Sequence, residues 1–255
     1  MRAIKIIALN TFREIIRDRI LYGIIVFALL LIGVSIVLGE LSFAEQARIS
    51  ANFGFAGIQL SAAILAMFAG STLVSREIDK QTVLTLLAKP VSRSQFLIGK
   101  FFGLTMVVAV VMFGLALVLA GLLFVLGLKL DKTFFEALHG IFLEAMLLTS
   151  IALFFGSFSR PVMTVVFTVS FFLIGHWVDS LHFFISKSKS ESFKALAGVV
   201  AEIVPNLEKF NWRSAPIYGD PISTQDVVMA SLYCGGWVLV LITATAVIFR
   251  RRDFV

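Results

Sequence analysis

The chain has 255 residues, of which 59% are hydrophobic, 13% aromatic and 15% charged, and its formal net charge is +6. A soluble domain carries about 25% charged residues, so this chain has too little polar surface to cover a water-soluble core. The composition therefore predicts a polytopic membrane protein. The basic residues flank apolar runs, where they anchor membrane helices, and do not indicate a nucleic-acid partner. The single cysteine, Cys234, excludes an intrachain disulfide and is expected to be buried.

Residues 1–19 are predicted to form an amphipathic helix that lies in the membrane interface and bends into the first span. Ile4, Ala8, Phe12 and Ile15 share one helical face, and polar residues occupy the opposite face. The pattern leaves open a plain anchor and a role in docking a partner. The candidate residues of this interfacial elbow helix are Phe12, Arg13, Ile15 and Arg17.

Six apolar runs approach or exceed the length of about 20 residues that a bilayer requires. They are residues 20–39, 53–74, 101–128, 137–158, 162–178 and 227–249. The short segments on the side of both termini hold 14 Lys and Arg residues, against 3 in the short segments on the other side. This asymmetry predicts that both termini and the segment 75–100 face the cytoplasm.

The segment 75–100 separates the second and third runs and carries an apolar stretch, 82–88, between charged flanks. That stretch is predicted to form a short helix that ends before Pro90. A loop that only joins two spans has little need for such a helix, so we expect another protein to bind it. Gly99 and Gly103 follow at a spacing that permits close packing of helices.

Ionisable residues are rare inside the predicted spans. Glu144 is the only Asp, Glu, Lys or Arg there, and His139 precedes it on the same helix. An intramembrane carboxyl group indicates either a substrate path or a structural hydrogen bond between helices. His176, Asp179 and His182 share a helical spacing and are weak metal candidates, so we expect no metal site.

The segment 179–226 is predicted to lie outside the membrane on the far side. It is too small for an independent domain, and residues 192–204 read as a short amphipathic helix that Ser192 caps. The chain contains no Gly-rich phosphate loop, so it cannot be assigned an ATP site of its own. It is therefore a secondary transporter, a channel, or the membrane half of a machine that another chain drives.

The string SREIDKQTVLTLLAKPVSRSQFLIGKFFG resembles the cytoplasmic loop between the second and third spans of ABC-2 type permeases. The matching positions are Arg76, Glu77, Leu86, Leu87, Pro90, Val91, Ser92, Arg93, Gly99 and Lys100. Asp79 stands where the family usually has a glycine. The segment Val204–Arg213 (VPNLEKFNWR) is similar to permeases linked to the maturation of multicopper enzymes, including nitrous oxide reductase.

The resemblance implies an all-α fold of the ABC-2 (type V-like) kind, a single permease domain of six transmembrane helices with an N-terminal interfacial helix. It implies export driven by ATP, with two permease chains and two cytoplasmic ATPase subunits in a bacterial-type cytoplasmic membrane. The expected ATPase-docking residues are Arg76, Glu77, Asp79, Lys80, Thr82, Val83, Leu84, Leu87, Pro90 and Arg93.

We accordingly expect no catalytic residue and no cofactor in this chain, with ATP and Mg²⁺ bound by the partner ATPase. Membrane lipids are expected partners, and a periplasmic partner protein is a further candidate. The alternatives are an ATP-independent secondary transporter or channel, and a force-transmitting assembly factor for the maturation of a periplasmic metalloenzyme.

Overall fold

The computed structural model describes residues 2–40, 45–79, 92–128 and 130–251, without the side chains of residues 74–79, 250 and 251. Every regular element in these ranges is a helix, and no strand occurs among them. In chain order the helices are α1 (Arg2–Ile16), α2 (Arg19–Glu40), α3 (Gln46–Asp79), α5 (Arg93–Val125), α6 (Lys132–Gly156), α7 (Pro161–Lys187), α8 (Glu191–Ile203), the 3-10 turn η1 (Glu208–Phe210), α9 (Ala215–Tyr218) and α10 (Thr224–Arg251).

Six of these helices are long and apolar enough to cross a membrane, as predicted: α2, α3, α5, α6, α7 and α10. The helices extend beyond several of the predicted apolar runs, most at the start of α5, which begins at Arg93, and at the end of α7, which continues to Lys187. A helix ends where its backbone hydrogen bonds end, and this point need not coincide with the change from apolar to polar residues. The start of α5 is fixed by Ser92, whose hydroxyl accepts a hydrogen bond from the Gln95 backbone N–H at 3.2 Å.

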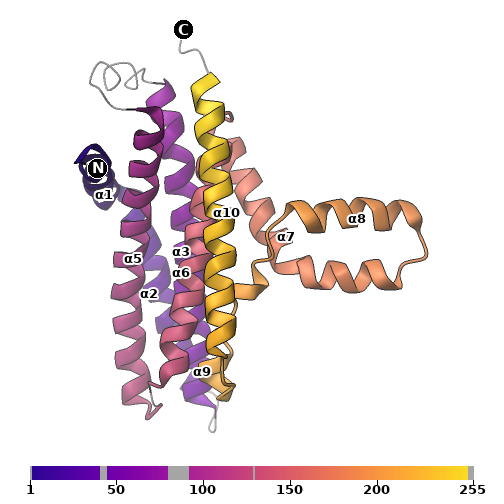
Figure 1. Cartoon of the computed structure of the whole chain (residues 1–255). Coiled ribbons are helices and arrows are strands. Elements are labelled where there is room, and N and C mark those ends of the chain that lie inside the picture. The colour runs from indigo at the N-terminus through magenta and orange to yellow at the C-terminus, as the bar shows by residue number, and fades with distance from the viewer. Residues whose placement is uncertain (1, 41–44, 80–91, 129, 252–255) are drawn as a thin grey trace.

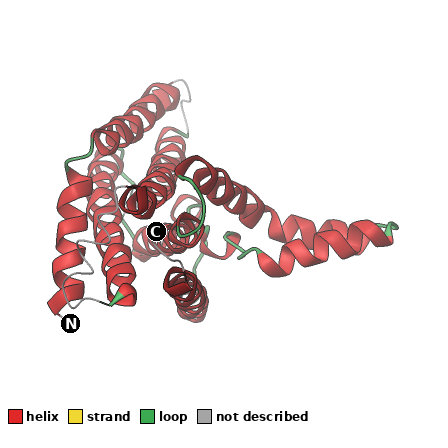
Figure 2. Cartoon of the chain, turned by 90° about the horizontal axis from the view of Figure 1, so that it is seen from above, coloured by secondary structure: helices red, strands yellow, loops and turns green. Residues whose placement is uncertain are grey.

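The spans form a bundle, and α1 lies across its long axis (Figures 1 and 2). Helix α1 and the last turns of α10 lie at the same end of the bundle, which we call the terminal end, and α9 lies near the opposite end (Figure 1). Helices α3 and α6 bury 67% of their most apolar stretch, whereas α7 and α10 bury 22% and 17%. The core therefore centres on α3 and α6, and the outer helices present apolar side chains to the surroundings.

Small residues let α3 approach its neighbours closely. A Cβ atom on Gly70 would lie 2.7 Å from the Cβ atom of Ala152 in α6, and a Cβ atom on Gly54 would clash with Leu119 in α5. Lipid tails are as apolar as the surfaces of the helices, so association in a membrane is driven by van der Waals contact, which close approach increases.

Cys234 of α10 is buried, as expected, at 1% exposure.

The C-terminal part of α7 and helix α8 lie side by side and project sideways from the bundle (Figures 1 and 2). The predicted cap of α8 is wrong: Ser190, not Ser192, accepts the hydrogen bond from the Phe193 backbone N–H at 3.4 Å. The segment 179–226 begins inside α7, which continues to Lys187. The chain returns to the bundle at residues 204–213, which we call the returning segment. That return brings polar residues into the core.

Candidate functional site

Of the predicted docking segment 75–100, the structure describes residues 75–79 at the end of α3 and residues 92–100 at the start of α5. The backbone of α3 is helical as far as Asp79, and α5 begins at Arg93. Nine predicted docking residues lie outside the described side chains: Arg76, Glu77, Asp79, Lys80, Thr82, Val83, Leu84, Leu87 and Pro90. Arg93 is the one predicted docking residue whose side chain the structure describes.

Arg93 joins the start of α5 to the last turns of α10. Its Nη1 donates a hydrogen bond to the carbonyl oxygen of Phe249 at 2.8 Å. The rings of Phe96 and Phe249 stack beside it, with centroids 6.2 Å apart and planes inclined by 16°. The last carbonyl groups of a helix lack intrahelical partners, and a cation near them is favourable. The contact therefore stabilises the end of α10 and fixes it to the start of α5, which is the C-terminal part of segment 75–100.

The first turns of α5 also hold α1. A Cβ atom on Gly103 would lie 2.7 Å from the Ala8 carbonyl oxygen and 2.6 Å from the Cβ atom of Thr11. A Cβ atom on Gly99 would lie 2.7 Å from the Cβ atom of Ile7. The predicted close packing at these glycines therefore occurs, and it joins α5 to α1.

A buried lysine reinforces this packing. Lys100, with a side chain 5% exposed, places Nζ 3.5 Å from Oε2 of Glu14 and 5.6 Å from the centre of the Phe96 ring. The lysine thus contacts both the carboxylate of α1 and an aromatic face of its own helix, which keeps its charge paired away from water. Lys100 was predicted to lie outside a span, and α5 instead includes it.

The elbow residues divide into buried and exposed positions. Ile15 is buried, Phe12 is half-buried, and Arg13 and Arg17 are exposed. The buried face of α1 comprises Ile7, Ala8, Thr11 and Ile15. This face differs from the predicted one, which included Ile4 and Phe12. The reason is that α1 packs on the two glycines of α5 through Ile7 and Thr11.

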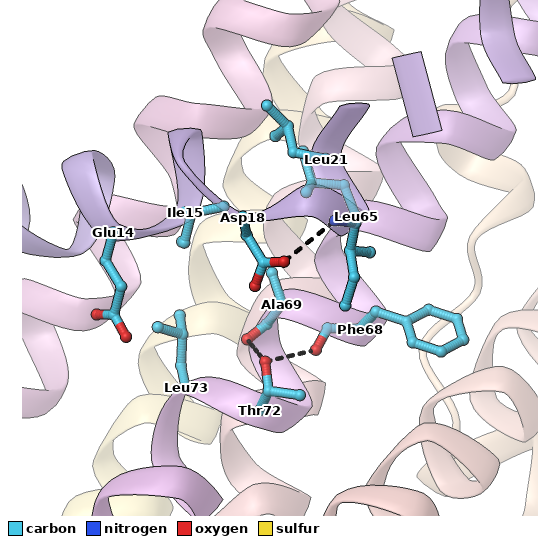
Figure 3. Close-up of a pocket in the computed structure, with 10 residues that line it drawn as sticks. Glu14, Ile15, Asp18, Leu21, Leu65, Phe68, Ala69, Thr72 and Leu73 are labelled. Carbon is cyan, nitrogen blue, oxygen red and sulfur yellow. Dashed lines mark hydrogen bonds between the residues drawn. The ribbon is translucent and has the colours of Figure 1, made fainter. Parts of the chain in front are cut away.

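A small pocket lies where α1 turns into α2 and meets α3 (Figure 3). Asp18 faces it and accepts a hydrogen bond from the Ile20 backbone N–H at 3.1 Å, which caps α2. Across the pocket Thr72 donates to the carbonyl oxygen of Phe68 at 3.0 Å (Figure 3). The cavity volume is about 20 Å³, enough for about one water molecule. This pocket is therefore a small gap where three helices pack together, and it is too small for a transported molecule.

A second polar site lies inside the bundle around Glu144 of α6, which is 1% exposed. Oε2 of Glu144 accepts a hydrogen bond from Nε2 of Gln59 in α3 at 2.7 Å. Oε1 lies 3.1 Å from Nε2 of His176 in α7. The Gln59 oxygen in turn accepts from Nη1 of Arg213 at 2.9 Å. The carboxyl group therefore links three spans, and through Gln59 it also reaches the segment that precedes α9.

The returning segment is built into the bundle around this site. Leu207 and Phe210 are fully buried, and the Leu207 backbone N–H donates to the Gly175 carbonyl oxygen at 3.0 Å. A Cβ atom on Gly140 would clash with the Phe210 carbonyl oxygen. Glycines in α6 and α7 thus make the room that the segment needs.

His139 and Glu144 do not form one site. Nε2 of His139 lies 3.0 Å from the hydroxyl oxygen of Ser231 in α10, whereas Glu144 contacts α3 and α7. The weak metal candidates are not brought together either. Asp179 accepts a hydrogen bond from the Asn206 amide at 2.6 Å, and His182 is exposed. Within the described part of the chain no group of three His, Cys, Asp or Glu residues is arranged to hold a metal ion.

The sequence profile of the family described as "ABC-2 family transporter protein" matches residues 5–254. The chain belongs to the ABC-2 transporter family. No individual curated protein matches it. The family match confirms the resemblance seen in the loop, and together with six apolar helices it makes the chain a multi-pass membrane component of a transporter. Membership of the subgroup linked to metalloenzyme maturation stays a prediction.

Sequence reasoning missed three residues of the polar cluster around Glu144 in this ABC-2 protein, namely Gln59, Glu208 and Arg213. Gln59 sits in an apolar run, and Glu208 and Arg213 fall in a segment assigned to the aqueous side. A signal was nonetheless present, since 204–213 combines charged residues with Leu207, Phe210 and Trp212. A short segment of that composition is expected to bury its apolar residues against the spans and carry its polar ones with them.

Proposed function

We propose that this chain is the transmembrane subunit of an ATP-driven ABC-2 transporter and that it performs no covalent chemistry itself. Family membership supports a transport component, and the absence of a Gly-rich phosphate loop from the sequence supports hydrolysis of ATP by another chain. A cytoplasmic ATPase would bind ATP and Mg²⁺ and pass its conformational change to the spans through segment 75–100.

The observation that carries this proposal is the convergence of four helices on that segment. Helix α3 leads into it and α5 leaves it, both as unbroken helices. The start of α5 is bonded to α10 through Arg93 and to α1 through the contact between Lys100 and Glu14. A displacement of the segment would therefore move four helices together, because packed helices shift as rigid elements.

The remaining features follow from the same assignment. Both termini would face the cytoplasm of a bacterial-type cytoplasmic membrane, since the terminal end carries the excess of Lys and Arg residues. Two copies of the chain would assemble with two ATPase subunits, with membrane lipids around the outer helices. Export is the proposed direction.

Docking is tested by co-purification with a cytoplasmic ABC ATPase produced together with this chain. Replacing both Leu84 and Leu87 with Glu should abolish ATPase association, because charged side chains cannot fill an apolar groove, while the protein stays inserted in the membrane. Tyr218→Glu is the control, since Tyr218 is 66% exposed and lies in α9 at the opposite end. Undiminished co-purification of the double variant would refute the docking role of the segment.

The similarity of Val204–Arg213 to metalloenzyme-maturation permeases does not by itself favour a docking surface there. Leu207 and Phe210 are fully buried, and Arg213 is bonded to Gln59. These residues stabilise the bundle from within. A partner on the far side would have to recognise other residues, so the transporter subunit is the function we propose.

A further inference from the structure

His176 lies between two carboxyl groups that come from different parts of the fold. Its Nε2 is 3.1 Å from Oε1 of Glu144, and its Nδ1 is 3.1 Å from Oε2 of Glu208. The side chains are 2% exposed for Glu144, 18% for His176 and 39% for Glu208. The three groups therefore form a row that starts in the core and ends near water.

The hydrogen-bonding capacity of these groups requires an extra proton. A neutral imidazole has one N–H donor and one acceptor nitrogen, and an ionised carboxylate only accepts. With neutral His176, one ring nitrogen would therefore present a lone pair to a carboxylate oxygen at hydrogen-bonding distance. One additional proton removes this conflict, and imidazole, ordinarily the stronger base, is the group that takes it.

We propose that His176 is a proton-binding site, doubly protonated at neutral pH, whose bound proton joins Glu208 of the returning segment to α7 and α6. The imidazolium then donates one hydrogen bond to each carboxylate. Charge-assisted bonds of this kind are stronger than neutral ones. The inference rests on this geometry and does not depend on coupling to an ATPase.

The surroundings of His176 support a cation at this position. Of the elements packed against α7, α6 presents Glu144, η1 presents Glu208, and α3 presents the neutral Gln59. Arg213 reaches Glu144 only through Gln59. In α8, Lys194 and Glu191 bond each other, and Asp179 of α7 is bonded to Asn206. The imidazolium is thus the cation in direct contact with both carboxylates.

The bound proton makes the attachment of the returning segment sensitive to pH. Both carboxylates have a second partner, since Gln59 donates to Glu144 in the core and the Asn211 amide donates to Oε1 of Glu208 at 2.8 Å, but Glu208 is part-exposed and can turn to water. When the proton leaves, we expect the contact between His176 and Glu208 to open first. The attachment is therefore present while His176 is protonated and is lost as the pH rises.

The test uses the full chain, labelled at histidine and studied by nitrogen NMR in detergent micelles or lipid nanodiscs. The protein has 3 His residues, so His139→Gln and His182→Gln variants assign the signals by subtraction. At neutral pH the His176 signals should be those of an imidazolium with two ring N–H groups. The signals of a neutral imidazole at neutral pH would overturn the proposal.

A conservative substitution makes the test specific. In Glu208→Gln the amide can donate to the ring nitrogen, so the demand for a second ring proton disappears and His176 should become neutral at neutral pH. Glu202→Gln, at an exposed position of α8, should leave the imidazolium signals unchanged. An unchanged imidazolium in Glu208→Gln would contradict the assigned role of Glu208.

Discussion

The guanidinium group of Arg93 donates a hydrogen bond to the carbonyl oxygen of Phe249 at 2.8 Å, across 156 positions of sequence. This contact fastens the last turns of α10 to the first turn of α5, where the proposed docking segment ends. The stacked rings of Phe96 and Phe249 exclude water beside it. The last span is therefore attached directly to the segment that we expect to transmit force.

Replacing Arg93 with Ala should loosen this attachment. A hydrogen bond from a charged donor contributes about 1.5–3 kcal/mol, so we expect a lower thermal unfolding midpoint in detergent and weaker stimulation of the partner ATPase. Arg160→Ala is the control, since Arg160 is exposed in the turn between α6 and α7. Equal midpoints for the two variants would show that the contact contributes little.

Replacing Gly103 with Ala should separate α1 from α5. The new Cβ atom would lie 2.7 Å from the Ala8 carbonyl oxygen, a backbone atom that cannot rotate away. Overpacking of this kind costs about 1–3 kcal/mol. Gly114→Ala on the same helix is the matched control, because nothing lies within 4 Å of its Cβ position.

The control should be neutral or gain about 0.5–1 kcal/mol from the better helix former. The measurement is thermal unfolding in detergent, together with protease accessibility of α1. If Gly103→Ala were as stable as Gly114→Ala, with α1 still protected, the two helices would not depend on this close approach.

Replacing Gly140 with Ala should displace the returning segment from the bundle. The added methyl group would meet the Phe210 carbonyl oxygen and lie 3.1 Å from Cε3 of Trp212. We expect faster backbone hydrogen exchange in residues 204–213, measured by mass spectrometry. Gly198→Ala in α8 has open space around its Cβ position and should leave that exchange unchanged. Unaltered exchange in both variants would contradict the tight packing at Gly140.

Replacing Glu144 with Ala should be strongly destabilising, because it leaves Gln59 and His176 without their partner in the core. Breaking a buried charged pair on one side costs about 3–5 kcal/mol. Glu144→Gln keeps the size of the side chain and an acceptor oxygen, so the loss of stability should be smaller. Glu202→Ala, at an exposed position, should change stability by no more than about 0.5 kcal/mol.

The same pair of variants separates the two roles predicted for Glu144. A role in the substrate path requires that Glu144→Gln impair stimulation of the partner ATPase or transport even where the fold is retained. Full activity of a stably folded Glu144→Gln protein would leave the carboxyl group with a structural role, the hydrogen bonds that it makes between helices.

The sequence by itself determined the membrane class, the number of candidate spans, the presence of an amphipathic N-terminal helix and the family. These features depend on local properties, since an apolar run long enough to cross a bilayer forms a helix whatever its neighbours are. The ends of α5 and α7 were harder to predict, because Arg93, Lys100 and Asp179 read as extramembrane residues although the helices continue through them.

Only the tertiary structure decided which polar residues meet. Glu144 pairs with Gln59, 85 positions away, and with His176, 32 positions away, while Glu208 returns from a segment that the sequence assigned to the aqueous side. A polar side chain in an apolar interior requires a partner, and this requirement is readable from sequence. The identity of the partner depends on how distant helices pack, which no local pattern specifies.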